Sequence, residues 1–257
     1  MSEIFMLLDG AMVYDALSSS KLFARATMPW TMPVLAHDDL RLTGPMLIAY
    51  QRLAKDGPEW QEVGRICTSF PQRLGYSLIQ TNLTLQALAV HLSRFALFTD
   101  GSGDTYGLRI GDSRIVPVLA QVLTSAQWNG LIAPMERWEF NKRDGTSAQF
   151  GEFEAVDPGT PGPLHLSDEQ IEQLAHATDP DNVLAHIDKA PTLESAAHTQ
   201  SRYEVACNCQ RLWQSSGSTD RRALVEFVRR VFQLGAGSRN DDAWMKQRLG
   251  EVFARLQ

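Results

Sequence analysis

Four charged residues are placed where they could pair across the fold. Asp9 ends the apolar run 4–8, and Arg109, Asp112 and Arg114 follow one another within six positions. Carboxylates and guanidinium groups form strong bidentate pairs when they meet. Asp9 closes a predicted strand, and Arg109 and Arg114 flank a predicted strand-to-helix junction. We therefore expect these groups to meet, most simply as a structural pair, with a partner contact and catalysis as the alternatives.

The segment Gly111-Asp112-Ser113 resembles the front of a nucleophile elbow, in which a serine sits on a sharp strand-to-helix turn between glycines. The second glycine is missing, since position 115 is Ile. A β-branched residue would crowd such a turn. The simpler interpretation is that Asp112 or Ser113 caps a helix over residues 114–123.

The glycines around residues 101–107 do not match a phosphate-binding loop. Gly101-Ser102-Gly103 and Gly107 lead into a predicted strand, whereas dinucleotide and P-loop motifs lead into a helix N-terminus. The loop also lacks a lysine followed by Ser or Thr. We predict a β-hairpin here, with strands over 96–99 and 106–110.

Metal ligation is not indicated by the cysteines or histidines. Cys207 and Cys209 are too closely spaced for a usual zinc pair, and on a helix their side chains would diverge by roughly 200°. The six histidines show no H-E-x-x-H or comparable spacing. We expect no metal and no cofactor. A hydrolase or transferase site around His91, Asp100 and Asp112 remains the enzymatic alternative.

Composition is typical of a folded globular chain, with 44% hydrophobic and 21% charged residues among 257. No run approaches the roughly 20 apolar residues of a membrane span, and no basic segment precedes the first apolar run. Three cysteines do not form a disulfide framework. These features predict a cytoplasmic protein without a membrane partner.

The formal net charge of −6 is unevenly distributed. Through His198 the chain has 14 basic and 24 acidic residues, and from Thr199 onward it has 10 basic and 6 acidic ones. A basic C-terminal part could attract an acidic partner, although it does not indicate nucleic acid in particular. The alternative is a solvated helix face without a partner.

Alternating and short apolar runs mix with helical patterns through about residue 155, so we predict an α+β fold with a sheet flanked by helices. The predicted scaffold lobe covers 1–156. A Pro/Gly-rich linker over 157–163 cannot continue a regular element. An all-α lobe is predicted for 164–257. The predicted strands are 4–8, 46–50, 76–80, 96–99, 106–110, 138–140 and 148–153, and the predicted helices of the first lobe are 12–17, 58–70, 83–95 and 114–123.

In the predicted helical lobe, Ser167 and Gln170 have the form of a capping box that opens a helix through Leu174. A longer helix can start at Pro191. The next helix carries an apolar stripe around Phe227, with Gly235 where a C-terminal cap would fall. The candidate partner-binding residues lie beside that stripe: Arg221, Arg222, Phe227, Arg229 and Arg230.

One bacterial family shares this pattern. The motif is Arg109-Ile-Gly-Asp112-Ser-Arg114, followed by Pro117, Leu119, Leu123, Gln127, Pro134 and Trp138. It resembles the type VI secretion effector adaptors or chaperones, catalogued as domain of unknown function 4123. Residues 7–10 and 45–47 also resemble that family's first two strands, and the resemblance covers roughly residues 4–155. Gly111 and Ala133 depart from the family pattern, the latter replacing a glycine before Pro134.

The resemblance implies a non-enzymatic adaptor. Members of that family bind the N-terminal region of a toxic effector and help to place it on the spike protein. It implies that no small molecule or nucleic acid is bound. In this chain, Asp9, Arg109, Asp112, Arg114, Pro134 and Trp138 are then expected to hold the scaffold together. The alternatives are the hydrolase named above and an immunity protein that neutralises an effector.

Overall fold

The structure is a computed structural model that describes residues 2–24, 28–151, 163–187, 196–234 and 241–256. The chain forms two compact units, Met1–Leu174 and Ala175–Gln257. None of the described helices is long and apolar enough to cross a membrane.

The first unit is built on a six-stranded antiparallel sheet with the strand order β2-β3-β1-β4-β7-β8. Strand β1 is central, and its last five residues are buried, as expected for a strand covered on both faces. The strands are β1 (Glu3–Asp9), β2 (Thr31–Pro33), β3 (Pro45–Ile48), β4 (Tyr76–Thr81), β7 (Met135–Asn141) and β8 (Ser147–Gly151).

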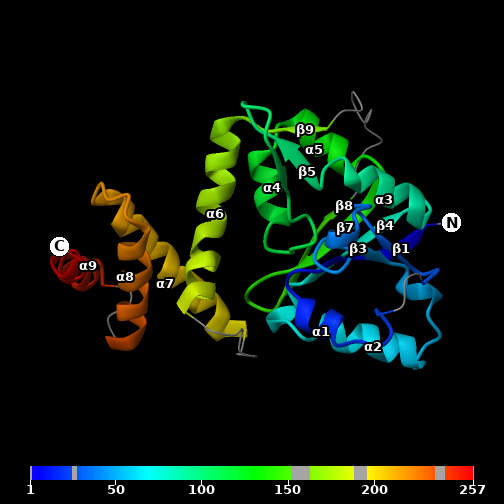
Figure 1. Ribbon diagram of the computed structural model, residues 1–257, viewed down its shortest axis with the longest axis horizontal. Helices are drawn as coiled ribbons and strands as arrows, with labels where there is room; N and C mark the ends of the chain where they lie inside the picture. The colour runs from blue at the N-terminus through cyan, green and yellow to red at the C-terminus, as the bar shows by residue number, and fades with distance from the viewer. Residues whose placement is uncertain (1, 25–27, 152–162, 188–195, 235–240, 257) are drawn as a thin grey trace. The chain divides into compact units, whose positions relative to one another are not determined.

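Helices cover both faces of this sheet (Figure 1). On one face lie α1 (Tyr14–Ser18) and α2 (Pro58–Cys67), where Cys67 Sγ contacts Met6 Sδ of β1 at 3.1 Å. The other face carries α3 (Leu85–Ser93), α4 (Val116–Val122) and α5 (Ser125–Ile132). Trp128 of α5 stacks on Trp138 of β7 with ring centroids 6.3 Å apart.

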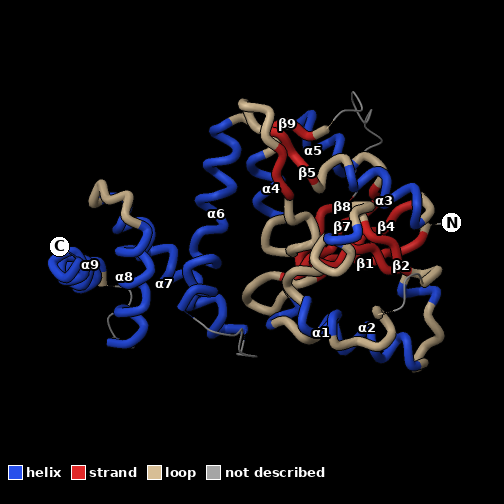
Figure 2. Tube along the Cα trace, in the orientation of Figure 1, coloured by secondary structure: helices blue, strands red, loops and turns tan. Residues whose placement is uncertain are grey.

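A separate three-stranded sheet has the order β6-β5-β9, of which β5 and β9 are labelled in Figure 2. Its strands are β5 (Leu97–Thr99), β6 (Thr105–Gly107) and β9 (Leu164–His165). Strands β5 and β6 form the predicted hairpin, in which Gly103 adopts a positive φ of 87°. Strand β9 pairs parallel to β5, so residues after the predicted linker still belong to the first unit.

The second unit is helical. It contains the larger part of α6 (Asp168–Ile187), then α7 (Ala196–Ser215), α8 (Arg221–Leu234) and α9 (Asp242–Leu256). Its core gathers buried residues from all four helices, including Val183, Cys209, Phe227 and Leu249. The sequence predicts a helix from Ser167 through Leu174, whereas α6 continues to Ile187 and contains Pro180 in its interior.

The predicted α+β class with a helical C-terminal part is confirmed. Residues 157–162 of the predicted linker 157–163 lie outside the described residues. Pro191 and Gly235 also lie outside them. The division between the compact units falls at 174/175, later than predicted. The physical reason is that Leu164, Leu166 and Leu174 are buried in the core of the first unit.

Candidate functional site

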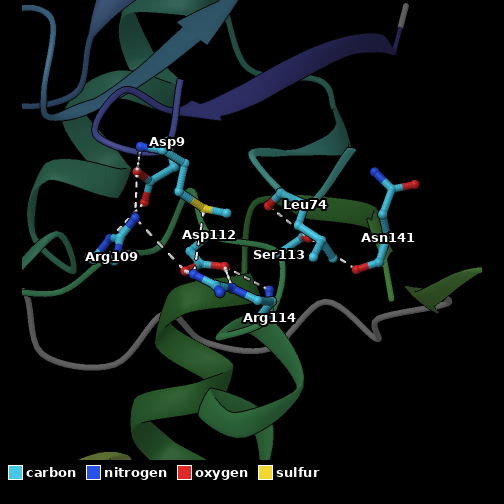
Figure 3. Close-up of polar contacts among 8 residues, drawn as sticks. Asp9, Leu74, Arg109, Asp112, Ser113, Arg114 and Asn141 are labelled. Atoms are coloured by element: carbon cyan, nitrogen blue, oxygen red, sulfur yellow. Dashed lines mark hydrogen bonds and ion pairs between the residues drawn. The ribbon is translucent and has the colours of Figure 1, made fainter. Parts of the chain in front are cut away.

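Asp9 ends the central strand β1, and its side chain is buried, with 4% of the residue exposed. The carboxylate accepts three hydrogen bonds. Met12 N–H donates to Oδ1 at 3.0 Å, and Arg109 donates from Nε to Oδ2 at 3.1 Å and from Nη2 to Oδ1 at 2.9 Å. Asp9 therefore has the bidentate arginine partner that the sequence predicts (Figure 3).

Two glycines let other backbone segments approach this end of β1. A Cβ on Gly111 would lie 2.8 Å from both Asp9 N and Leu8 O, and one on Gly10 would lie 2.3 Å from Leu42 O. Side chains cannot be accommodated at such distances without moving backbone. Residues 109–114 form a corner before α4 and pack closely against β1. Gly111, one of the two departures from the family pattern, is therefore required at this position.

Asp112 is the most buried acid of the corner, with 1% of the residue exposed. Its carboxylate accepts from Arg114 N at 3.0 Å, from Arg114 Nε at 2.9 Å and from Arg114 Nη2 at 2.7 Å. Arg109 Nη2 lies 3.9 Å away and extends the network from Asp9 to Asp112. Four charged residues from two distant segments thus form one chain of contacts, which Figure 3 shows.

Burial by itself would raise the pKa of Asp112. The charge and hydrogen bonds of Arg114, with the charge of Arg109, outweigh burial and hold the pKa of Asp112 below its ordinary value. Burial likewise opposes the charged form of Arg109, but Asp9 and then Asp112 raise the pKa of Arg109. Both groups are held in their charged forms, which suits structural ion pairs. A general acid would need the opposite shift at Asp112.

Ser113 is fully buried and binds two backbone carbonyls. Its hydroxyl hydrogen is directed between Leu74 O at 2.9 Å and Asn141 O at 3.0 Å, and its N–H donates to Leu74 O at 3.0 Å. In Figure 3 the side chain lies between these two segments. Ser113 thus joins the loop before β4 to the end of β7, and the contacts described for it give it no base.

The predicted cap is placed differently in the structure. Helix α4 begins at Val116, and its N-cap residue, Ile115, makes no side-chain cap bond. Asp112 instead caps the preceding turn through Arg114 N–H. The predicted start at residue 114 is therefore two residues early, because the Asp112 and Arg114 side chains bind each other in a turn before the helix.

Pro134 and Trp138 secure the strand that follows α5. The carbonyl of Pro134 accepts a hydrogen bond from Thr81 Oγ1 of β4. Trp138 is fully buried and donates from Nε1 to Ser77 Oγ at 2.9 Å. These motif residues join β7 to β4 and make no contact with the Asp9 to Arg114 corner among the described interactions.

The residues of the enzymatic alternative bind different neighbours. His91 faces the carbonyl of Leu131 at 2.8 Å, so its Nε2 must carry a proton and donate. Burial lowers the pKa of His91. Asp100 accepts from Ser102 N and Asp104 N, both at 2.9 Å, within the β5–β6 turn. Within the described ranges, no interaction joins His91 or Asp100 to Asp112.

The cysteines are free thiols, of which Cys67 and Cys209 are buried. Burial raises the pKa of the Cys67 thiol to about 12 and also raises that of Cys209. Such thiols are poor nucleophiles at neutral pH. In the described part of the chain, no three His, Cys, Asp or Glu residues are grouped so that they could hold a metal ion.

The predicted partner-binding residues of α8 divide into buried, paired and exposed positions. Phe227 is fully buried in the core of its unit, so it cannot offer a contact surface. Arg221 pairs with Asp179, Arg229 pairs with Glu226, and Arg230 donates to Glu251 at 2.7 Å from Nη2. Arg222 is exposed, and its side chain has no ion pair among the described residues.

Sequence reasoning missed two contributors to the corner, Leu74 and Asn141. Both act through backbone carbonyls, and Asn141 also donates from Nδ2 to Arg73 O at 2.9 Å. Arg73 and the preceding Gln72 have positive φ values of 57° and 50°, which cost energy in residues other than glycine. Carbonyl contacts leave no pattern in residue types, so no sequence signal could have identified them.

Comparison with known proteins gives one match. Residues 4–130 match the family model described as Domain of unknown function (DUF4123). No curated protein and no solved structure matches this chain. The matched range includes β1, Asp9, the Arg109 to Arg114 corner and α4, the features that the geometry joins. Residues 4–130 of this chain, just under half of its length, are therefore similar to the DUF4123 family.

Proposed function

We propose that this chain is a non-enzymatic adaptor that binds a type VI secretion effector and loads it onto the spike protein. The proposal starts from the domain match over residues 4–130 and from the resemblance of the motif to the type VI adaptors. The partners are then the effector's N-terminal region and the spike protein, and the site of action is the cytoplasm.

The non-enzymatic part of the proposal rests on the contacts of the side chains that could take part in catalysis. Asp9 and Asp112 are buried and each is bound by an arginine, while the Ser113 hydroxyl is directed at two carbonyls. The histidine of the enzymatic alternative, His91, donates to the Leu131 carbonyl, and Asp100 accepts hydrogen bonds within its own turn. Groups used in this way stabilise a scaffold and are poorly placed for proton transfer.

Deleting the gene tests the proposal in the cell. The family that this chain resembles is encoded beside an effector and a spike protein. We therefore expect the effector encoded beside this chain to remain intact but to lose its delivery to target cells, with spike secretion retained. Delivery that is unchanged in the deletion strain contradicts the proposal. Killing of the deletion strain by its own effector would instead favour an immunity protein.

An enzymatic control uses two substitutions in the full chain. In the deletion strain, Ser113→Ala and His91→Gln remove the hydroxyl and the imidazole that a hydrolase would need. An adaptor carrying either change restores effector delivery once it is folded. Loss of delivery by a folded variant that still binds the effector would support catalysis at that residue.

A further inference from the structure

The described edges of the two sheets differ in how they are protected. Strand β2 has three residues and ends in Pro33, and β6 has three residues that follow the acidic turn of Asp100 and Asp104. Strand β8 has five residues, Ser-Ala-Gln-Phe-Gly, with neither a proline nor a charge. Proteins usually protect edge strands with short length, proline or charge, and β8 has none of these.

The register identifies which backbone groups of β8 lie on the open side. Lys142 N–H donates to the directly opposite Thr146 carbonyl at 2.8 Å, so that pair is hydrogen bonded. Hydrogen-bonded and non-bonded pairs alternate along antiparallel strands, so Ala148 and Phe150 bond to β7. The main-chain groups that point away from β7 are those of Ser147, Gln149 and Gly151.

An aromatic row reaches the same edge. Phe150 stacks on Phe140 of β7 at 5.3 Å between ring centroids and meets Trp128 edge-on at 5.2 Å. Phe150 and Ala148 are only partly buried. A strand added beside β8 would extend the sheet. Its side chains directly opposite Ala148 and Phe150 would cover the apolar surface of those two residues.

We infer that β8 is a strand-addition site for an extended segment of the effector. This inference rests on the proposed function, since the effector is the partner. Side chains opposite Ala148 and Phe150 are apolar, and those opposite Ser147, Gln149 and Gly151 are polar or basic. The basic preference follows from charge, because residues 1–174 contain 13 Lys and Arg against 20 Asp and Glu. A second copy of this chain would bring the same net negative charge and is therefore disfavoured as the partner.

Hydrogen exchange in the full chain tests the open edge before any partner is added. We expect the Gln149 amide to exchange about tenfold or more faster than the Ala148 and Phe150 amides, which bond to β7. Adding the effector encoded beside this chain is expected to slow Gln149 selectively. Protection of Gln149 in the free chain would overturn the inference, because the edge would already be covered.

A matched pair of substitutions tests the backbone contribution. Gln149→Pro removes an outward N–H at an edge position where proline is tolerated, whereas Gln149→Val keeps the N–H and favours a strand. We expect Gln149→Pro to weaken effector affinity about tenfold or more and Gln149→Val to stay within about threefold of the wild type. Ser147→Pro against Ser147→Val repeats the test if Gln149→Pro does not fold.

The outcomes separate this inference from the proposed function. If the wild-type chain binds the effector and folded Gln149→Pro binds equally well, the strand-addition site is wrong and the adaptor proposal stands. If the wild-type chain binds no effector, the proposed function itself fails. A wild-type homodimer that Gln149→Pro dissociates, with unchanged effector affinity, would assign the edge to a second copy and overturn the inference.

Discussion

Arginine–carboxylate pairs occur in both compact units, but their surroundings differ. In the first unit the carboxylates of Asp9 and Asp112 are buried, with 4% and 1% of each residue exposed. In the second unit most pairs are more exposed: about half of the Asp242 side chain is exposed, whereas the Asp179 side chain, paired with Arg221, is 13% exposed. Water therefore screens the exposed pairs of the second unit, such as Arg211 with Asp242, and screens the buried Asp9 and Asp112 carboxylates much less.

This difference separates residues that stabilise the fold from residues that could contact a partner. Breaking a buried pair leaves a charge without water or counterion, which is strongly destabilising. Breaking a surface pair leaves both groups hydrated. The arginines of the motif are thus expected to act on folding, and the exposed Arg222 of α8 is free to act on binding without a large effect on folding.

The largest expected effect is that of Arg114→Met. It leaves the buried Asp112 carboxylate without its bidentate partner and should lower the free energy of unfolding by about 3 kcal/mol. Arg211→Met is the matched control from the second unit. Arg211 pairs with Asp242, and about half of each side chain is exposed, so we expect a loss of no more than about 1 kcal/mol. Urea unfolding measures both, and equal losses would contradict the comparison.

The second prediction concerns acid. The pKa of Asp112 is lowered in the folded state, so its contribution is fully present above the unfolded-state pKa of about 4 and is lost as the pH falls through the lower folded value. Unfolding measured between pH 7 and 3 should show a wild-type advantage over Asp112→Asn that is constant at neutral pH and shrinks below about pH 4. An advantage that grows in acid would mean that Asp112 is protonated in the fold.

Ser113→Ala should have an intermediate effect. It removes the donor to the Leu74 and Asn141 carbonyls, and we expect a loss of about 1 to 2 kcal/mol in unfolding free energy. Ser113→Thr keeps the hydroxyl but adds a methyl group in a fully buried position, so it tests whether space or hydrogen bonding dominates. An unchanged free energy of unfolding in Ser113→Ala would mean that the Ser113 hydroxyl does not stabilise the corner.

The smallest effect on stability is expected for Arg222→Glu, within about 0.5 kcal/mol, because the side chain is exposed. If Arg222 contacts an acidic partner, this change should weaken effector binding and make it less sensitive to salt. Arg230→Glu is the comparison, since Arg230 pairs with Glu251 and should affect stability more than binding. Unchanged effector affinity in Arg222→Glu would exclude Arg222 as a contact.

Much of the first unit could be predicted from the sequence. The apolar alternation located β1, β3, β4 and both hairpins, and the meeting of Asp9 with Arg109 followed from residue types at the ends of predicted elements. Such features depend on local pattern and on the strong preference of carboxylates for arginine. The capping box of Ser167 and Gln170 is likewise confirmed by bonds in both directions.

Other features depend on long-range contacts and left no local signal. Strand β9 has two residues and exists because it pairs with β5, about 65 positions earlier. The helical spacing around Phe227 fits a core residue as well as an exposed contact residue. In the structure Phe227 is buried in the core of the second unit. The sequence shows Gly111 as a departure from the family pattern. The reason for a glycine there, the close approach of the Asp9 backbone, is visible only in the structure.

The adaptor proposal is tested most directly by mixing the purified full chain with the effector and the spike protein encoded beside it. Size-exclusion chromatography with light scattering would report the mass of each complex, and mass spectrometry would report whether the effector is altered. The account predicts a complex that contains the chain and an intact, unmodified effector and that then joins the spike protein. Absence of any complex, or an effector cleaved or chemically modified by this chain, would contradict it.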